Sequence, residues 1–506
     1  MSVRSIVNAT ILIALFAALA GCITVGPDYS PPSENAPASY ASVLPPGLSA
    51  GDLEPETIAT WWRELNDPAL SGLIDAAVTG NKTLQQTAQR VQAARANRGL
   101  AYSAFFPTVN ASAGATGTAT TRGTDANNSS AVTSSDPTTA ALQASLSEDP
   151  PAVRRSTAYN AGFDASWEID LFGKTRRSVE AADADLGAAR AAYRDALVSL
   201  VAEVALAYVE LRTTERRLTI AESNLKSQES SLALAEWRAQ AGLSDRLDTE
   251  QARLSVESTR SRLPGLRTNR ENAKNNLTTM LGLPPGQFPE ELQAVLQSGG
   301  LPVAPRELVI DLPANALRRR PDVRRAEREL AAATARIGVT EAELYPQLRL
   351  PGSLSYELSA PGTDGWTASL GVGINWNIFD AGAIRRRLAA SEATQQEALF
   401  AYEASVLGAL KEIEAALLAY GGEEQRRAAL LSAAEHAASA ANLTRLKYKA
   451  GLLDFSDVLN AEQKLLSAED ELALSEGETV ANFVRLYKAL GGGWSAFDGE
   501  ESNADQ

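Results

Sequence analysis

Four stretches of the chain alternate between apolar and polar residues, the period of a β-strand with one apolar face and one wet face. The clearest runs from Trp366 to Ile378, where seven apolar residues alternate with six polar or glycine residues. A strand of about 10 residues is long enough to cross a bilayer when tilted. We therefore expect four membrane strands, placed at 107–117, 158–171, 347–359 and 366–379.

The period changes to that of a helix directly after two of these strands. Residues 383–421 contain no proline and a single interior glycine, and a proline-free segment also follows Gly173 as far as Pro264. These segments predict helices of about 65 residues, each followed by a turn and a return helix of about 40 residues. The expected turns, the tips of two helical hairpins, lie at 241–248 and 450–457.

An internal repeat explains this order of elements. A shift of 209 residues places Trp167 on Trp376, Gly173 on Gly382 and Gly242 on Gly451, and it holds over about 115 residues. Upstream of the strands the shift is 239, because the polar loop at 117–156 is longer than the turn at 360–365. We expect a first repeat at 61–282, an equatorial linker at 283–313, a second repeat at 314–491 and an acidic disordered tail at 492–506.

The N-terminus has the features of an export signal. A short positive stretch precedes a compact apolar run that ends in Leu-Ala-Gly-Cys at 19–22. We expect a lipoprotein signal peptide at 1–21 and lipidation of Cys22, the only cysteine. The proline-rich residues 22–60 then predict an extended tether, without a regular core element, that lets the lipid sit away from the body.

Four strands cannot close a barrel, and an open sheet edge in lipid leaves backbone groups unpaired. The chain must therefore oligomerise if the strands are in the membrane. Two, three or four copies would supply 8, 12 or 16 strands, and the periodicity does not choose between them. A half-buried sheet of a soluble protein and a structural periplasmic coiled-coil lipoprotein are the alternatives, but the coiled coil would not need the strands.

Composition narrows the function further. The net charge of −15 disfavours nucleic acid as a partner. One cysteine and one histidine exclude multi-histidine metal sites, and the sequence contains no P-loop, no GxGxxG and no GxSxG. We therefore expect neither an enzyme nor a cofactor.

Several ordered motifs together resemble the TolC-like outer-membrane efflux family, in its NodT-type lipoprotein branch. They are LAGC at 19–22, Trp61-Trp62 with Asp67-Pro68, WEIDLFG at 167–173, LRRRPD at 317–322, WNIFDAG at 376–382 and YKAG at 448–451. The resemblance implies a mixed α and β fold in which a trimer forms a 12-stranded outer-membrane β-barrel continuous with a helical periplasmic tunnel.

The same resemblance implies the exit duct of a tripartite efflux system for drugs or other small molecules. The implied partners are two further copies of the chain, a periplasmic adaptor, an inner-membrane pump of the resistance-nodulation-division (RND) type and outer-membrane lipid at Cys22. The duct of a type I protein-secretion system is the alternative within this class. Substrate choice is expected to reside in the pump.

In this family the hairpin tips close the tunnel, so the resemblance implies a periplasmic gate at Tyr448, Asp248 and Asp457, with tip turns at Gly242 and Gly451. Our hypothesis is that three copies of each aspartate ring the constriction and hold cations. The alternative is that these aspartates cap the return helices. Asn460 and Leu453 depart from the polar lock of some members, which carry aspartate and arginine there.

The change from strand to helix period marks a second candidate site. Gly173 and Gly382 would lie where the barrel becomes the tunnel, and Trp167 and Trp376 would anchor the chain at the inner membrane interface.

Overall fold

The computed structural model describes residues 24–32, 37–42, 44–51, 54–121, 153–290, 293, 300–305, 307–359 and 364–500. The expected signal peptide and Cys22 lie outside these ranges. The chain divides into two compact units. The first comprises Met1–Asp28, Gly99–Glu180 and Ala335–Glu392, and the second comprises Tyr29–Arg98, Ala181–Thr334 and Ala393–Gln506. Four helices contribute residues to both units: α4 (Lys82–Ser103), α6 (Lys174–Gln240), α10 (Pro321–Glu341) and α11 (Ala383–Lys449).

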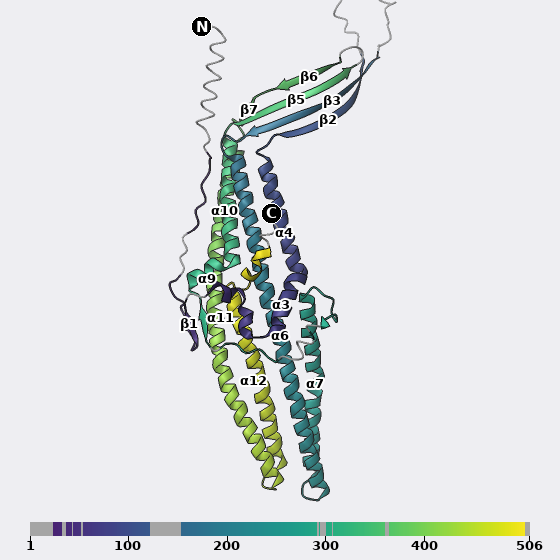
Figure 1. The fold of residues 1–506 in the computed structure, drawn as a ribbon, viewed down its shortest axis with the longest axis vertical. Helices are drawn as coiled ribbons and strands as arrows, with labels where there is room; N and C mark the ends of the chain where they lie inside the picture. The colour runs from purple at the N-terminus through teal and green to yellow at the C-terminus, as the bar shows by residue number, and fades with distance from the viewer. Residues whose placement is uncertain are drawn as a thin grey trace, which may run out of the picture. The chain divides into compact units, whose positions relative to one another are not determined.

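The first unit holds an antiparallel sheet, which Figure 1 shows with its strands side by side. The strands are β2 (Thr108–Thr121), β3 (Val153–Ile169), β5 (Gln347–Ser359), β6 (Gly365–Leu370) and β7 (Gly373–Asn375). Their order is β2-β3-β5-β6, and β7 also pairs with β5. A single 3-10 turn, η2 (Ala342–Leu344), precedes β5 in this part of the described chain.

The fourth expected strand, 366–379, is shorter than the sequence pattern predicts and is divided in two. β6 and β7 keep one register on β5, because Gly352 pairs with Leu370 and Leu348 with Ile374. Between them Gly371 donates its N–H to the carbonyl of Pro351 at 2.9 Å. Proline has no N–H to return the bond, so the ladder is interrupted there. Residues 376–379 lie outside the strand.

The sheet separates its side chains by polarity, as the alternation predicts. On one face Phe163 stands between Ala111 and Leu354 on the neighbouring strands. On the other face Glu168 pairs with Arg349 at 3.2 Å. Large apolar side chains on the first face are exposed within the single chain, among them Phe163, Trp366 and Leu370. An apolar face of this kind requires a covering that the described residues of one copy do not supply.

The second unit is built on two helical hairpins, α6 with α7 (Arg246–Met280) and α11 with α12 (Phe455–Ala489). Both long helices have 67 residues and both return helices have 35. Each helix of the second hairpin starts 209 residues after its counterpart, Lys174 against Ala383 and Arg246 against Phe455. This is the shift at which the sequence repeats.

Each return helix meets a shorter helix end to end. Asn81, between α3 (Pro68–Gly80) and α4, donates its side-chain amide to the carbonyl of Met280 at 2.9 Å. Arg320, between α9 (Pro313–Arg319) and α10, donates Nη1 to the carbonyl of Ala489 at 2.6 Å. Both acceptors are the last residues of α7 and α12, so each bond satisfies a free helix-end carbonyl. The two joints therefore occupy equivalent places in the two repeats.

The proline-rich segment forms more structure than its composition predicts. Leu48–Ala50 form β1, which pairs in parallel with β4 (Leu308–Ile310) inside the expected linker 283–313. Tyr40 is buried and donates its hydroxyl to the carbonyl of Asp311 at 2.7 Å. α2 (Pro55–Ala59) adds Ile58 to the main core. The expectation that residues 22–60 lack any core element is therefore wrong, since proline excludes long regular elements but not short ones.

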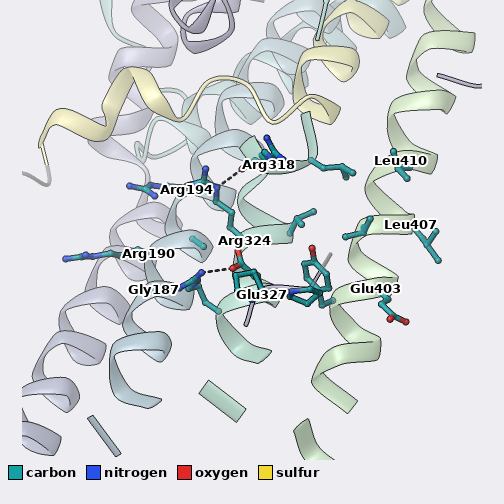
Figure 2. Close-up of a pocket in the computed structure, with 17 residues that line it drawn as sticks. Gly187, Arg190, Arg194, Arg318, Arg324, Glu327, Glu403, Leu407 and Leu410 are labelled. Atoms are coloured by element: carbon teal, nitrogen blue, oxygen red, sulfur yellow. Dashed lines mark hydrogen bonds and ion pairs between the residues drawn. The ribbon is translucent and has the colours of Figure 1, made fainter. Parts of the chain in front are cut away.

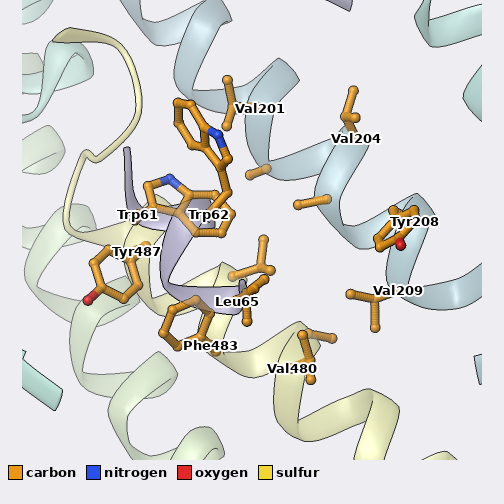
Figure 3. Packing of buried hydrophobic residues seen from close by; sticks show 14 of the residues in the cluster. Trp61, Trp62, Leu65, Val201, Val204, Tyr208, Val209, Val480, Phe483 and Tyr487 are labelled. Carbon is orange, nitrogen blue, oxygen red and sulfur yellow. The ribbon is translucent and has the colours of Figure 1, made fainter. Parts of the chain in front are cut away.

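The main core lies where the hairpins meet the segment η1 (Trp61–Leu65). Trp61 stacks on Tyr487 with ring centroids 5.7 Å apart (Figure 3). Trp62 stacks on Phe497 with ring centroids 5.9 Å apart. Phe497 belongs to η3 (Ser495–Glu500), within the expected disordered tail. That expectation is wrong for residues 492–500, because apolar side chains in this acidic stretch pack on the core. Residues 501–506 lie outside the described chain.

Candidate functional site

The two hairpin tips share one local design. Gly242 and Gly451 have φ values of +70° and +76°, which favour glycine because it has no Cβ. In each tip the residue after the glycine donates its N–H to a carbonyl in the last turn of the preceding helix. Leu243 donates to the carbonyl of Arg238, and Leu452 donates to the carbonyl of Lys447. This is the usual way in which a glycine ends a helix. The sequence Ala-Gly-Leu therefore fixes both turns.

Tyr448 brings the two tips together within one protomer. Its ring is buried, with 2% of its surface exposed, and packs on Phe455 at 5.3 Å. From the other hairpin, the Arg238 guanidinium lies 4.7 Å from the centre of the Tyr448 ring and donates to its backbone carbonyl at 2.9 Å. Ala235 and Ala252 complete this small apolar cluster. The tips are thus held by a cation–π contact and a hydrogen bond.

The aspartates of the tips divide into two positions. Asp245 and Asp454 are the N-cap residues of α7 and α12, whereas Asp248 and Asp457 lie in the first turns of these helices. The alternative that Asp248 and Asp457 cap the helices is therefore wrong, since the cap position is three residues earlier. Acidic residues in a first turn still interact favourably with the helix dipole.

Electrostatics couple Asp248 to both hairpins. Burial raises the pKa of the Asp248 carboxyl, and the negative charges of Asp245 and Asp454 raise it further, against the opposing charge of Arg238. Burial also raises the pKa of the Tyr448 hydroxyl, to which the charge of Asp248 adds. The packed tip therefore disfavours the charged form of Asp248.

Sequence reasoning missed Arg238, although a spacing in α6 could have indicated it. Polar residues recur every seven positions along this helix, and each contacts the second hairpin in the structure. Arg217 pairs with Asp470 at 2.7 Å, Asn224 donates to Glu469 at 2.9 Å and Ser231 donates to Glu462 at 2.7 Å. Arg238 is the next position. A repeat of seven residues keeps one helix face toward a partner helix.

At the junction of strand and helix, the predicted glycines precede the long helices directly. Gly173 and Gly382 have φ values of +83° and +84°, one residue before α6 and α11 begin. The two predicted tryptophans make equivalent bonds, from Trp167 Nε1 to the carbonyl of Phe105 at 2.9 Å and from Trp376 Nε1 to the carbonyl of Leu344 at 3.0 Å. Their role as membrane anchors remains a prediction.

The segment that follows Cys22 is held on α6. Arg177, with 3% of its surface exposed, donates Nε to the carbonyl of Val25 at 3.1 Å. Its Nη2 donates to the carbonyl of Gly26 at 3.0 Å and to the carboxylate of Asp28 at 2.7 Å. Residues 25–28 are therefore held by Arg177, so this part of the expected tether is not a free linker.

The described residues contain neither a candidate metal site nor a candidate membrane-spanning helix. No group of three or more His, Cys, Asp or Glu side chains there could hold a metal ion. Within the same residues no helix has both the length and the apolar character that a membrane span requires. The features that remain are an amphipathic sheet and two long hairpins whose tips converge.

Comparison with known proteins identifies the class. A family model described as outer membrane efflux protein matches residues 73–283 and 312–492. The chain is 29% identical over 484 residues to nodulation protein T of Rhizobium leguminosarum bv. trifolii, covering 94% of this chain and 96% of that protein. It is 32% identical over 438 residues to the pyoverdine export outer membrane protein OpmQ of Pseudomonas putida, covering 86% and 88%.

A solved structure agrees with these relatives. The outer-membrane channel OprN superposes with a TM-score of 0.80 at 34% sequence identity, covering 93% of this chain and 99% of that one. The chain belongs to the outer membrane efflux protein family, which confirms the resemblance found in the sequence motifs. It is an outer-membrane efflux channel, and the members of its family are transport proteins rather than enzymes.

Proposed function

We propose that this chain is the exit duct of a tripartite RND-type efflux system that expels drugs or other small molecules. The observation that carries the proposal is the sheet. Its apolar face is exposed. Within the described residues its edge strands are β2 on one side and β6 with β7 on the other, and no further strand pairs with either edge. In lipid, unpaired strand edges cost several kcal/mol for each backbone group. Joining edges between copies removes that cost.

Three copies would close 12 strands into one barrel, and their hairpins would line a periplasmic tunnel. Exposed apolar side chains on the long helix α11 support contacts between protomers. Phe400, Leu407 and Leu418 are all more than half exposed in the single chain. A row of this kind on a helix favours another helix over water. The homotrimer thus accounts for the exposed apolar surface of both the sheet and the helices.

The lipid at Cys22 would then lie close to the sheet. Val25, three residues later, is fixed by Arg177 near the start of α6. Three residues span at most about 11 Å. The proposed position of the acyl chains is therefore the inner membrane interface, beside Trp167 and Trp376.

The proposed partners are a periplasmic adaptor and an inner-membrane pump. The relative OpmQ is named as a pyoverdine export protein, which supports a small molecule as the cargo. Selection of the cargo is proposed to reside in the pump.

The converging tips would form the gate. Arg238 and Tyr448 would hold each protomer closed, and Asp248 and Asp457 from three copies would ring the constriction. Carboxylates close together repel one another and attract cations. An Asp457→Ala trimer with unchanged cation selectivity would contradict the ring.

The R238Q substitution tests the gate. It removes the cation–π contact with Tyr448 and weakens the charge-assisted bond to the Tyr448 carbonyl. Such contacts contribute about 1–3 kcal/mol, so we expect a rise of about fivefold or more in the fraction of time that single trimers conduct in planar bilayers. Glutamine keeps the unbranched stem as far as Cδ and a polar end group, although it is shorter and uncharged, which limits other effects.

R253Q is the matched control, because Arg253 also lies near the tip but pairs with Glu236 and Glu250 at the surface. We expect its conductance to equal that of the wild type. Equal conductance of R238Q, R253Q and the wild type would refute the gate. A trimer of R238Q that inserts in bilayers but never conducts would refute the duct itself.

The gate should also respond to pH. The raised pKa of Asp248 belongs to the packed tip, so protonation favours that state. This contribution is present at low pH and is lost as pH rises through the raised pKa. We expect open probability to fall about two- to fivefold on acidification toward pH 4, the scale of partly exposed charge interactions. D248N should lack this dependence, whereas E250Q, a surface control on the same helix, should keep it.

A further inference from the structure

The two edges of the sheet lack the features that keep an edge strand from pairing. Residues 108–121, which form β2, and 365–375, which include β6 and β7, contain no charged residue and no proline. The inner strands differ, since β3 carries Asp164 and Glu168 and β5 carries Arg349. Charges and prolines on an edge strand oppose its pairing with another chain. Both edges of this sheet are therefore suited to a further strand.

The backbone groups on these edges differ from the polar groups inside the second unit. At the cavity between α6, α10 and α11, Arg324 donates Nε to the carbonyl of Arg318 at 2.6 Å (Figure 2). Glu327 accepts from Arg328 there at 2.5 Å. The outer sides of β2 and of β6 with β7 have no strand beside them within the described residues. In lipid, only a strand from another chain can satisfy these backbone groups.

The strand register inside the sheet repeats together with the sequence. Strand β5 repeats β2 after 239 residues, and β6 with β7 repeats β3 after 209 residues. Thr108 pairs with Ser166, and their counterparts in the second repeat, Gln347 and Asn375, pair with each other. Every described pair of β5 with β6 or β7 follows the same rule. The strand pairs β2–β3 and β5–β6/β7 are therefore structural copies of one another.

The contact between these two strand pairs gives a register for the contact between copies of the chain. Inside the chain the contact joins β3 to β5, where Asn160 pairs with Glu357. The counterpart of Asn160 is Ser369 on β6, and the counterpart of Glu357 is Thr118 on β2. When copies join as the repeats do, Ser369 of one copy stands opposite Thr118 of the next.

We propose that β6 and β7 of one copy pair antiparallel with β2 of the next copy in this register. The contact is called the seam, and the opposed residues include Ser369 with Thr118, Leu370 with Gly117, and Ile374 with Ala113. The inference rests on the proposed trimeric duct and adds the residues through which its copies meet.

The apolar side chains fit this pairing. Leu370 and Ile374 are 88% and 73% exposed in the single chain. The register sets them opposite Gly117 and Ala113, which are small and leave room for them. A shift by one residue would instead turn the apolar face of one copy toward the polar face of the next.

The polar face fits the seam as well. Thr118 Oγ1 lies 2.9 Å from Ser156 Oγ on β3, and Ser369 Oγ lies 2.8 Å from Ser353 Oγ on β5. With Ser369 opposite Thr118 of the next copy, these four hydroxyl groups form one row across the seam. Each hydroxyl can both donate and accept, so hydrogen bonds can continue along the row.

Oxidative cross-linking of paired cysteines tests the register. In T118C/S369C the opposed Cα atoms would lie about 4.5–5.5 Å apart, which suits a disulfide. T116C/S369C and T120C/S369C are matched controls, because each moves one cysteine by two residues on the same face, to about 7–8 Å. We expect copper phenanthroline to convert T118C/S369C into a covalent trimer at least about tenfold faster than either control.

A second pair keeps the test decisive where T118C/S369C fails to assemble. S112C/N375C belongs to the same register and should also link, whereas N110C/N375C is shifted by two residues and should not. Faster linking in any of the shifted pairs would overturn the register and leave the duct intact.

Single variants test other arrangements of the edges. T118C and S369C each retain Cys22, as the wild type does, and neither should form a covalent dimer. A dimer of T118C that the wild type does not form would join two β2 strands and overturn the seam. Trimers that conduct in planar bilayers but link in neither T118C/S369C nor S112C/N375C would also overturn it. A wild-type chain that stays monomeric and never conducts would overturn the duct and the seam together.

Discussion

Replacement of Arg320 by leucine should destabilise the protein by about 3–5 kcal/mol, the usual cost of removing one partner from a buried ion pair. Arg320 is 8% exposed and donates to Asp322 at 2.7 Å, to Glu412 at 2.6 Å and to the last carbonyl of α12 at 2.6 Å. Leucine would leave two carboxylates and one helix-end carbonyl without this partner. The joint between α10 and α12 should therefore loosen.

The measurement is the apparent melting temperature of the trimer, together with its resistance to protease near Ala489. R485Q is the control, because Arg485 pairs with Glu478 at the surface and lies on the same return helix. A melting temperature of R320L equal to that of R485Q would contradict a structural role for Arg320.

The pH dependence of this joint follows from Asp322. Burial tends to raise the pKa of its carboxyl, but the hydrogen bond and charge of Arg320 outweigh burial and lower the pKa overall. A lowered pKa means that the stabilisation is present above the ordinary pKa of an aspartate and is lost as pH falls through the lowered value. In R320L this part of the acid sensitivity should disappear.

The W61A substitution should be comparably damaging, at about 3–5 kcal/mol, because it leaves a large cavity in the main core. Trp61 is 1% exposed and contacts Tyr487, Phe483 and Trp62, with ring centroids 5.7 to 6.0 Å away. Aromatic pairs add about 0.5–1.5 kcal/mol beyond the area that they bury. We expect a low yield of assembled trimer and a reduced melting temperature.

W237A provides the comparison, since Trp237 on α6 is 67% exposed. Its removal should change the melting temperature little. The C-terminal turn offers a second readout, because the N–H of Gly493 donates to the carbonyl of Ile58 beside Trp61 at 3.1 Å. Protease sensitivity near residue 493 should therefore rise in W61A, and an unchanged digestion pattern would argue against the packing seen here.

The elements of this fold could be predicted because their determinants are local. The strand at 347–359 has the bounds that its alternation indicates, and α11 runs from Ala383 to the tip as the absence of proline predicts. Positive φ angles at Gly173, Gly242 and their repeats follow from the steric freedom of glycine.

Contacts between distant parts of the chain could not be predicted in this way. Pro351 interrupts a strand 20 residues away only because the register places it opposite Gly371. Arg238 meets Tyr448 across 210 residues, and the seven-residue spacing along α6 does not identify Tyr448 as its partner. The same holds for the packing of Tyr40 and Phe497, which stand in segments whose composition predicts an extended tether and a disordered tail, respectively.

The sequence by itself therefore determined the type, length and repetition of the elements, since backbone sterics and side-chain period act within a few residues. It also determined the family, because the motifs keep their order and spacing. Only the tertiary structure decided which residues hold the tips, the joints and the N-terminal segment. Those bonds depend on which helices lie side by side, because packing brings only one of many chemically equivalent side chains within reach of its partner.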